Sequence, residues 1–84
     1  MSPAQPRFKR ESAGLKKRSL VLAGHSTSLA LEPAFWAVLE AMAAARGASL
    51  AGLVAALDAG RGAQPLASAC RLAALAFAAE RPAQ

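Results

Sequence analysis

The sequence predicts a small, mainly α-helical fold with a short β-ribbon, assembled as an intertwined homodimer. Residues 27–31 alternate apolar and small side chains, with the two-residue period of a half-buried strand. Two amphipathic helical patterns follow, separated by a tight break. A lone strand cannot satisfy its own hydrogen bonds, and an alanine-rich chain of 84 residues encloses only a thin core. We therefore expect a second copy to complete both the sheet and the core.

The positive charge lies at the N-terminus. Residues 1–18 contain six cationic side chains and one acid, whereas residues 19–84 contain four of each, so the first segment carries the whole net charge of +5. We predict a basic, disordered arm over residues 1–17, an ordered domain over residues 18–81 and a tail over residues 82–84. A basic arm ahead of a neutral fold is typical of a nucleic-acid binder. A solubilising tail and an arm that contacts an anionic membrane are the alternatives.

Residues 19–31 form the extended part of the chain, and two arrangements are open. In the first, Gly24-His25 is the two-residue turn of a hairpin, with Gly24 at positive φ, and Leu22 lies opposite Thr27. In the second, only residues 27–31 pair, with their copies across a dimer axis. The two arrangements can coexist.

The first helix is expected from Pro33, which suits a first helical turn, to about Arg46. Gly47 ends it as a left-handed cap. Its apolar side chains recur at helical spacing on one face: Phe35, Val38, Leu39 and Met42.

The second helix begins after Ser49, an N-cap residue, and ends at Gly60 and Gly62. Its apolar stripe is Leu50, Leu53, Val54 and Leu57. A third helix should run from Pro65 or Leu66 to about Arg81, and Pro82 closes it. One side of this third helix carries Leu66, Ala69, Leu72, Ala73 and Ala76.

Five short motifs follow one another along these elements. They are Lys17-Arg18-Ser19, Gly24-His25-Ser26-Thr27-Ser28, Leu31-Glu32-Pro33-Ala34-Phe35-Trp36, Gly47-Ala48-Ser49-Leu50, and Leu66-Ala67-Ser68-Ala69-Cys70-Arg71. With them, residues 17–76 resemble the ribbon-helix-helix family of bacterial DNA-binding proteins. That family forms two-fold dimers in which two strands, one per chain, form an antiparallel ribbon that enters the major groove, while the N-terminus of the second helix contacts a phosphate.

The resemblance implies which side chains meet DNA and which form the dimer core. The DNA contacts would be Lys16, Lys17, Arg18, His25, Ser26, Ser28, Ala30 and Ser49. The dimer core would be Leu29, Leu31, Phe35, Trp36, Leu39, Leu53 and Leu57. The outward ribbon side chains are short, which favours binding through phosphates and the basic arm over long bidentate base contacts.

Other classes of function are disfavoured. A single histidine, a single cysteine and scattered acids make no catalytic or metal-binding constellation, so we expect no enzyme, no metal and no cofactor. Cys70 is expected to pack in the core, and one cysteine fits a cytoplasmic protein. No apolar run reaches the roughly 18 residues of a membrane span.

The predicted function is a homodimeric DNA-binding transcriptional regulator. The alternative is a protein-interaction module, antitoxin-like or adaptor, that keeps the same dimeric fold.

Overall fold

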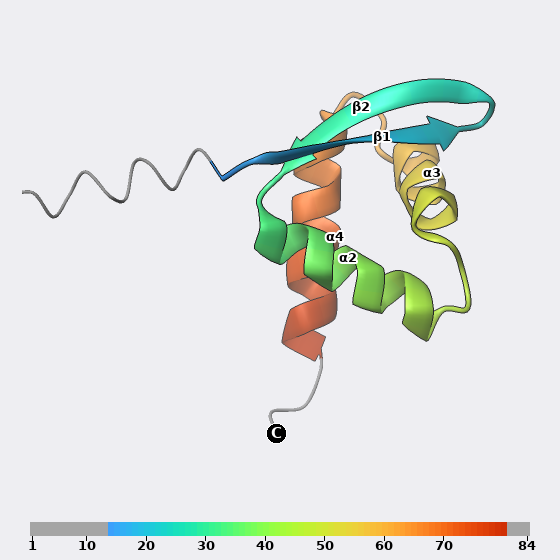
Figure 1. The fold of residues 1–84 in the computed structure, drawn as a ribbon. Coiled ribbons are helices and arrows are strands. Elements are labelled where there is room, and N and C mark those ends of the chain that lie inside the picture. Colours follow the sequence, from blue (N-terminus) through green and yellow to red (C-terminus); the bar gives the residue numbers. More distant parts are fainter. Residues whose placement is uncertain (1–13, 81–84) are drawn as a thin grey trace, which may run out of the picture.

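The computed structural model describes residues 14–80, and it confirms a mainly α-helical fold with a short two-stranded ribbon. In chain order the elements are β1 (Lys16–Leu22), β2 (His25–Leu31), α2 (Pro33–Ala45), α3 (Leu50–Gly60) and α4 (Leu66–Glu80). Within residues 14–80, α2, α3 and α4 all lie on one side of the ribbon (Figure 1). Residues 1–13 of the predicted arm and the predicted tail, residues 82–84, lie outside the described residues, as does the expected helix end at Arg81.

The ribbon forms within one chain. β1 and β2 pair antiparallel from Lys16 opposite Leu31 to Leu22 opposite His25. This is the hairpin of the first predicted arrangement, but the predicted turn was wrong by one residue: Ala23 and Gly24 form it, at φ 51° and 86°. The observed register pairs all seven residues of each strand before Pro33 begins α2. Since the register differs from the predicted one by two positions, each side chain keeps its expected face.

The hairpin also corrects the premise that the strand over residues 27–31 lacks a partner. Its partner is β1 of the same chain. Lys16 and Lys17, assigned to the arm by the sequence, are the first two residues of β1. The ladder therefore needs no second copy, and a dimer must rest on other grounds.

The core lies between the inner face of the ribbon and the helices. Leu22, Leu29 and Leu31 are buried on that face, and Trp36 and Leu39 of α2 are buried against them. Burying side chains of this size stabilises a fold by about 1.5–3 kcal/mol each. The buried core of the described residues is completed by Met42, Ala43, Leu53, Val54, Ala69, Cys70 and Ala74.

The helix ends follow the sequence signals. Pro33 occupies the first turn of α2, and Gly47 follows the helix at φ 68°, the left-handed conformation expected of its cap. Ser49 caps α3: its hydroxyl oxygen accepts a hydrogen bond from the Gly52 N–H at 2.9 Å. After α3, Arg61 pairs with Asp58 at 2.5 Å and donates to the Gln64 carbonyl at 2.7 Å, which fixes the connection to α4.

The buried face of α4 differs from the predicted one. Leu72 was expected on it but is 54 % exposed, and Ala76 is exposed as well. Leu66, Ala69 and Ala73 lie on the packed side as expected, while Cys70, Ala74 and Phe77 take the places of Leu72 and Ala76 there. The helix is rotated so that Phe77, the largest apolar side chain near its end, reaches the core, because aromatic burial outweighs that of a small alanine.

A second set of contacts joins α4 to the start of α2. The Arg71 guanidinium bonds both carboxylate oxygens of Glu32, at 2.9 and 3.3 Å, and lies 5.8 Å from the centroid of the Phe35 ring. The hydrogen bonds from Arg71 hold the pKa of Glu32 below its ordinary value of 4.5.

Within residues 14–80 no single helix has the length and apolar character to cross a membrane; the bent pair α2 and α3 meets that test only in combination.

Candidate nucleic-acid interface

No helix of residues 14–80 covers the outward face of the ribbon. Six side chains share it as three directly opposed pairs, because residues opposite one another in an antiparallel ladder point to the same side. The pairs are Lys17 with Ala30, Ser19 with Ser28, and Val21 with Ser26. Five of the six residues are exposed and Ala30 is half-buried. The face therefore offers one ammonium group, three hydroxyls and two apolar side chains to a partner.

Two strands about 4.8 Å apart match the major groove of B-DNA, which is about 12 Å wide and admits a two-stranded ribbon. The predicted contacts Ser26, Ser28 and Ala30 all lie on this face. Sequence reasoning omitted Ser19 and Val21, which complete it. The signal was present, since Leu20 and Leu22 alternate with them and are expected to point inward.

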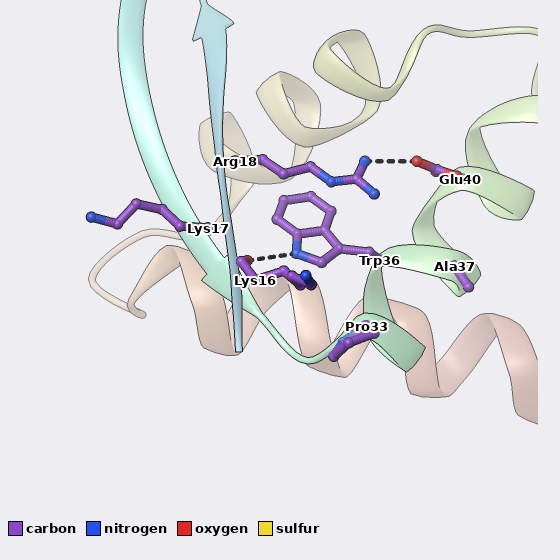
Figure 2. Close-up of a pocket in the computed structure, with 7 residues that line it drawn as sticks. All are labelled: Lys16, Lys17, Arg18, Pro33, Trp36, Ala37 and Glu40. Carbon is purple, nitrogen blue, oxygen red and sulfur yellow. Dashed lines mark hydrogen bonds and ion pairs between the residues drawn. The ribbon is translucent and has the colours of Figure 1, made fainter. Parts of the chain in front are cut away.

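Arg18 lies on the opposite face, among the helices. Its guanidinium stacks over the Trp36 indole, 4.5 Å from the ring centroid, and pairs with the Glu40 carboxylate at 2.6 Å. Figure 2 shows Arg18 on the Trp36 side of β1 and Lys17 directed away from it. The expectation that the extended part of the chain begins at residue 19, after Lys16, Lys17 and Arg18, was therefore wrong. They form the start of β1, whose alternation sends Lys17 outward and Arg18 inward.

A pocket of about 450 Å³ lies between the start of β1 and α2 (Figure 2). Trp36 lies at the base of the pocket and is only 2 % exposed. The Trp36 indole N–H donates a hydrogen bond to the Lys16 carbonyl oxygen at 2.9 Å. Three cationic side chains and one acid surround an apolar wall in the lining set Lys16, Lys17, Arg18, Pro33, Trp36, Ala37 and Glu40. Since Glu40 already neutralises Arg18, the lysines supply the uncompensated charge of this pocket.

His25 and Ser49 occupy different places from the outward row. His25 is exposed directly after the turn, and its register places it with the inner row of β2. Ser49 is exposed at the N-terminus of α3, where its hydroxyl already accepts the Gly52 N–H. The Ser49 hydroxyl can still donate its own hydrogen, and the first N–H groups of a helix have no acceptor within the helix, so the hydroxyl and the backbone N–H groups beside it can both contact a phosphate.

The side chains expected in a dimer core lie together in the core of a single chain. Leu29, Leu31, Trp36, Leu39 and Leu53 are buried, and Phe35 and Leu57 pack against them.

Cys70 is buried as expected, and burial raises the pKa of its thiol, with the Asp58 carboxylate adding to the effect. Residues 14–80 contain no group of three or more side chains placed to hold a metal ion.

Comparison with known proteins gives one match. A family model described as a ribbon-helix-helix domain covers residues 15–78, from the residue before β1 almost to the end of α4. No curated protein matches the chain. No solved structure matches it either.

Proposed function

The chain belongs to the ribbon-helix-helix family, and from that premise we propose that it is a homodimeric DNA-binding protein that regulates transcription in the bacterial cytoplasm. Proteins of this family generally bind DNA and regulate transcription. In this proposal the ribbon enters the major groove with its outward face toward the bases. The basic N-terminal segment and Lys17 contact phosphates.

One observation supports this proposal above the others: among the described elements, no helix covers the outward face of the ribbon, which bears Lys17, Ser19, Ser26 and Ser28. Each of these groups can bond to a phosphate oxygen or to a base edge. A ribbon with one polar face and one packed face is ordinary in a small sheet. What adds to it here is charge, since the excess of +5 lies in residues 1–18, at the start of the same hairpin.

The dimer is part of the proposal and rests on the family, whose members typically form dimers. Within residues 14–80 each strand of the hairpin has one unpaired edge, and pairing of such edges between two protomers would give a sheet of four strands. A sheet of four strands would exceed the width of about 12 Å that the groove admits. We therefore propose that each protomer presents its own two-stranded hairpin to DNA.

A second candidate is supported by the outer side of α4. Leu72 and Leu75 are 54 % and 55 % exposed on it, in a helix whose other side packs in the core. Exposed leucines on a helix suit a protein partner. This is the antitoxin-like or adaptor alternative, in which the dimeric fold is kept and α4 binds another protein.

A salt titration separates the two candidates. Binding of the full chain to a random-sequence duplex is followed by fluorescence anisotropy from about 50 to 300 mM salt, and a genomic fragment library is compared with it. Phosphate binding predicts that log affinity falls linearly with log salt. Selection of particular genomic fragments would show base readout in addition. Absence of salt-dependent binding would refute the DNA proposal and leave the protein-interaction candidate.

A further inference from the structure

Val21 is 64 % exposed, more than any other large apolar side chain in the described part of the chain. It lies on the outward face of β1, opposite Ser26 and two residues before Ala23, the first residue of the turn. The core does not account for it, because the inner face of β1 supplies Leu20 and Leu22 to the packing. Val21 therefore presents two methyl groups to solvent on a face that is otherwise mostly polar.

We infer that Val21 is a specificity-determining residue that packs against the C5-methyl group of thymine in the major groove. The inference rests on the proposed function, since it requires the ribbon to enter DNA. Among the groups exposed in the major groove, the thymine methyl is the apolar one, and apolar side chains contact it directly. Serine hydroxyls, by contrast, accept or donate to either kind of base pair.

The geometry of the hairpin supports close approach. The outward side chains next to Val21, those of Ser19 and Ser26, are small, so the backbone can lie deep in the groove. Residues 17–21 span four steps of about 3.3 Å, similar to four base-pair steps of about 3.4 Å. Lys17 and Val21 thus face opposite ends of one short site. Lys17 reaches a phosphate or a guanine at one end, and Val21 reads a methyl group at the other.

This assignment gives β1 an apolar contact on the reading surface. Ser26, Ser28 and Ala30 of β2 offer hydroxyls and a single methyl group, whereas Val21 offers a branched side chain whose conformation is restricted by its strand. A stiff apolar side chain loses little rotamer freedom on contact. Removal of one buried methyl-sized group costs about fourfold in affinity at about 0.8 kcal/mol per group.

The test uses two alternating duplexes that differ only in the methyl group, poly(dA-dT) and poly(dA-dU) of equal length. Anisotropy gives the Kd of the full chain for each. Wild type should bind the thymine duplex more tightly by about fourfold. Val21→Ala should bring the ratio of the two constants toward one. Leu72→Ala is the matched control, because it trims a similarly exposed apolar side chain on α4 and should leave the ratio unchanged.

Circular dichroism and sedimentation of Val21→Ala complete the experiment, and both should match wild type. A ratio that Val21→Ala leaves unchanged, or a wild-type ratio of one, overturns the inference while salt-dependent binding still supports the DNA proposal. A drop in sedimenting mass for Val21→Ala also overturns it, because Val21 would then be a contact between protomers. Failure of wild type to bind either duplex would reject the proposed function itself.

Discussion

The indole Nε1–H of Trp36 donates a hydrogen bond to the backbone carbonyl oxygen of Lys16, with 2.9 Å between the two atoms. This bond connects α2 to the first residue of β1, and Arg18 covers the same indole from the ribbon side. The start of β1 is thereby held against the core by a side chain twenty residues away. The same contact helps to set the face of Lys17, which lies between the two held residues.

Trp36→Phe should keep most of the apolar packing but lose this hydrogen bond. We expect the free energy of unfolding to fall by about 1–2 kcal/mol, since a partly buried carbonyl loses its partner. Urea unfolding followed by circular dichroism measures the change. Trp36→Ala, which also leaves a cavity, should cost about 3–5 kcal/mol. Equal stability of Trp36→Phe and wild type would show that the bond contributes nothing.

Leu31→Asp and Ala30→Asp test the face assignment of β2. Leu31 is fully buried and Ala30 is half-buried on the outward side. A carboxylate at position 31 would lie unpaired in the core and should cost about 4 kcal/mol or more, enough to unfold a small domain. At position 30 it can reach water, and circular dichroism should show a folded protein. If the two variants are equally folded, the assigned register is wrong.

Acid should weaken the connection between α4 and the start of α2. The pKa of Glu32 is lowered in the folded state, mainly by its hydrogen bonds from Arg71, so the unfolded chain binds protons at a higher pH. The contribution of this pair to stability is fully present above the ordinary value of 4.5 and is lost as pH falls through the lowered one. Urea midpoints from about pH 6 to about pH 3 should therefore fall more steeply for wild type than for Glu32→Gln.

The Cys70 thiol should be inert in the native protein. It is fully buried, and its raised pKa reduces the thiolate that reacts with disulfide reagents. Ellman's reagent should leave native protein unmodified for as long as it stays folded and label it promptly in urea. Cys70→Ala supplies the blank. Rapid labelling of native protein would mean that α4 leaves the core readily.

Neutralising the basic segment should weaken DNA binding for every sequence. The change is Arg7→Gln, Lys9→Gln and Arg10→Gln in the full chain, which keeps its length. The slope of log affinity against log salt should become shallower by about 0.9 for each phosphate that the variant no longer neutralises. The preference between DNA sequences should persist, because phosphate contacts carry no base information. An unchanged slope would exclude these three side chains from the interface.

The sequence predicted the elements better than it predicted their partners. Local signals set the helix ends: Pro33, Gly47 and Ser49 each lie where the pattern placed them. The turn moved to Ala23-Gly24 because the complete ladder, which depends on both strands and on Pro33, outweighs the local preference for glycine at the first turn position.

Side-chain placement at the interface depended on contacts between distant elements. Arg18 is one of three similar consecutive cations in the sequence, yet Trp36 and Glu40, both on α2, hold it on the inner side of the ribbon. Leu72 fits a helical stripe, yet the packing of Phe77 turns α4 so that Leu72 faces out. Periodicity marks a face of a helix to within a residue or so, but neighbouring elements decide which edge of that face is covered.

The central claim is that the outward face of the ribbon contacts DNA. The most direct measurement compares the affinities of Ala30→Asp and Ala79→Asp for a random-sequence duplex at about 100 mM salt. Both variants add one negative charge to the chain, at Ala30 on the ribbon or at Ala79, which is exposed in the last turn of α4. The C-terminal end of α4 lies away from the ribbon (Figure 1). We predict that Ala30→Asp weakens binding by at least about tenfold and that Ala79→Asp remains close to wild type. Equal losses for the two folded variants would contradict the claim, because the charge would then act through the net charge of the chain and not through the ribbon.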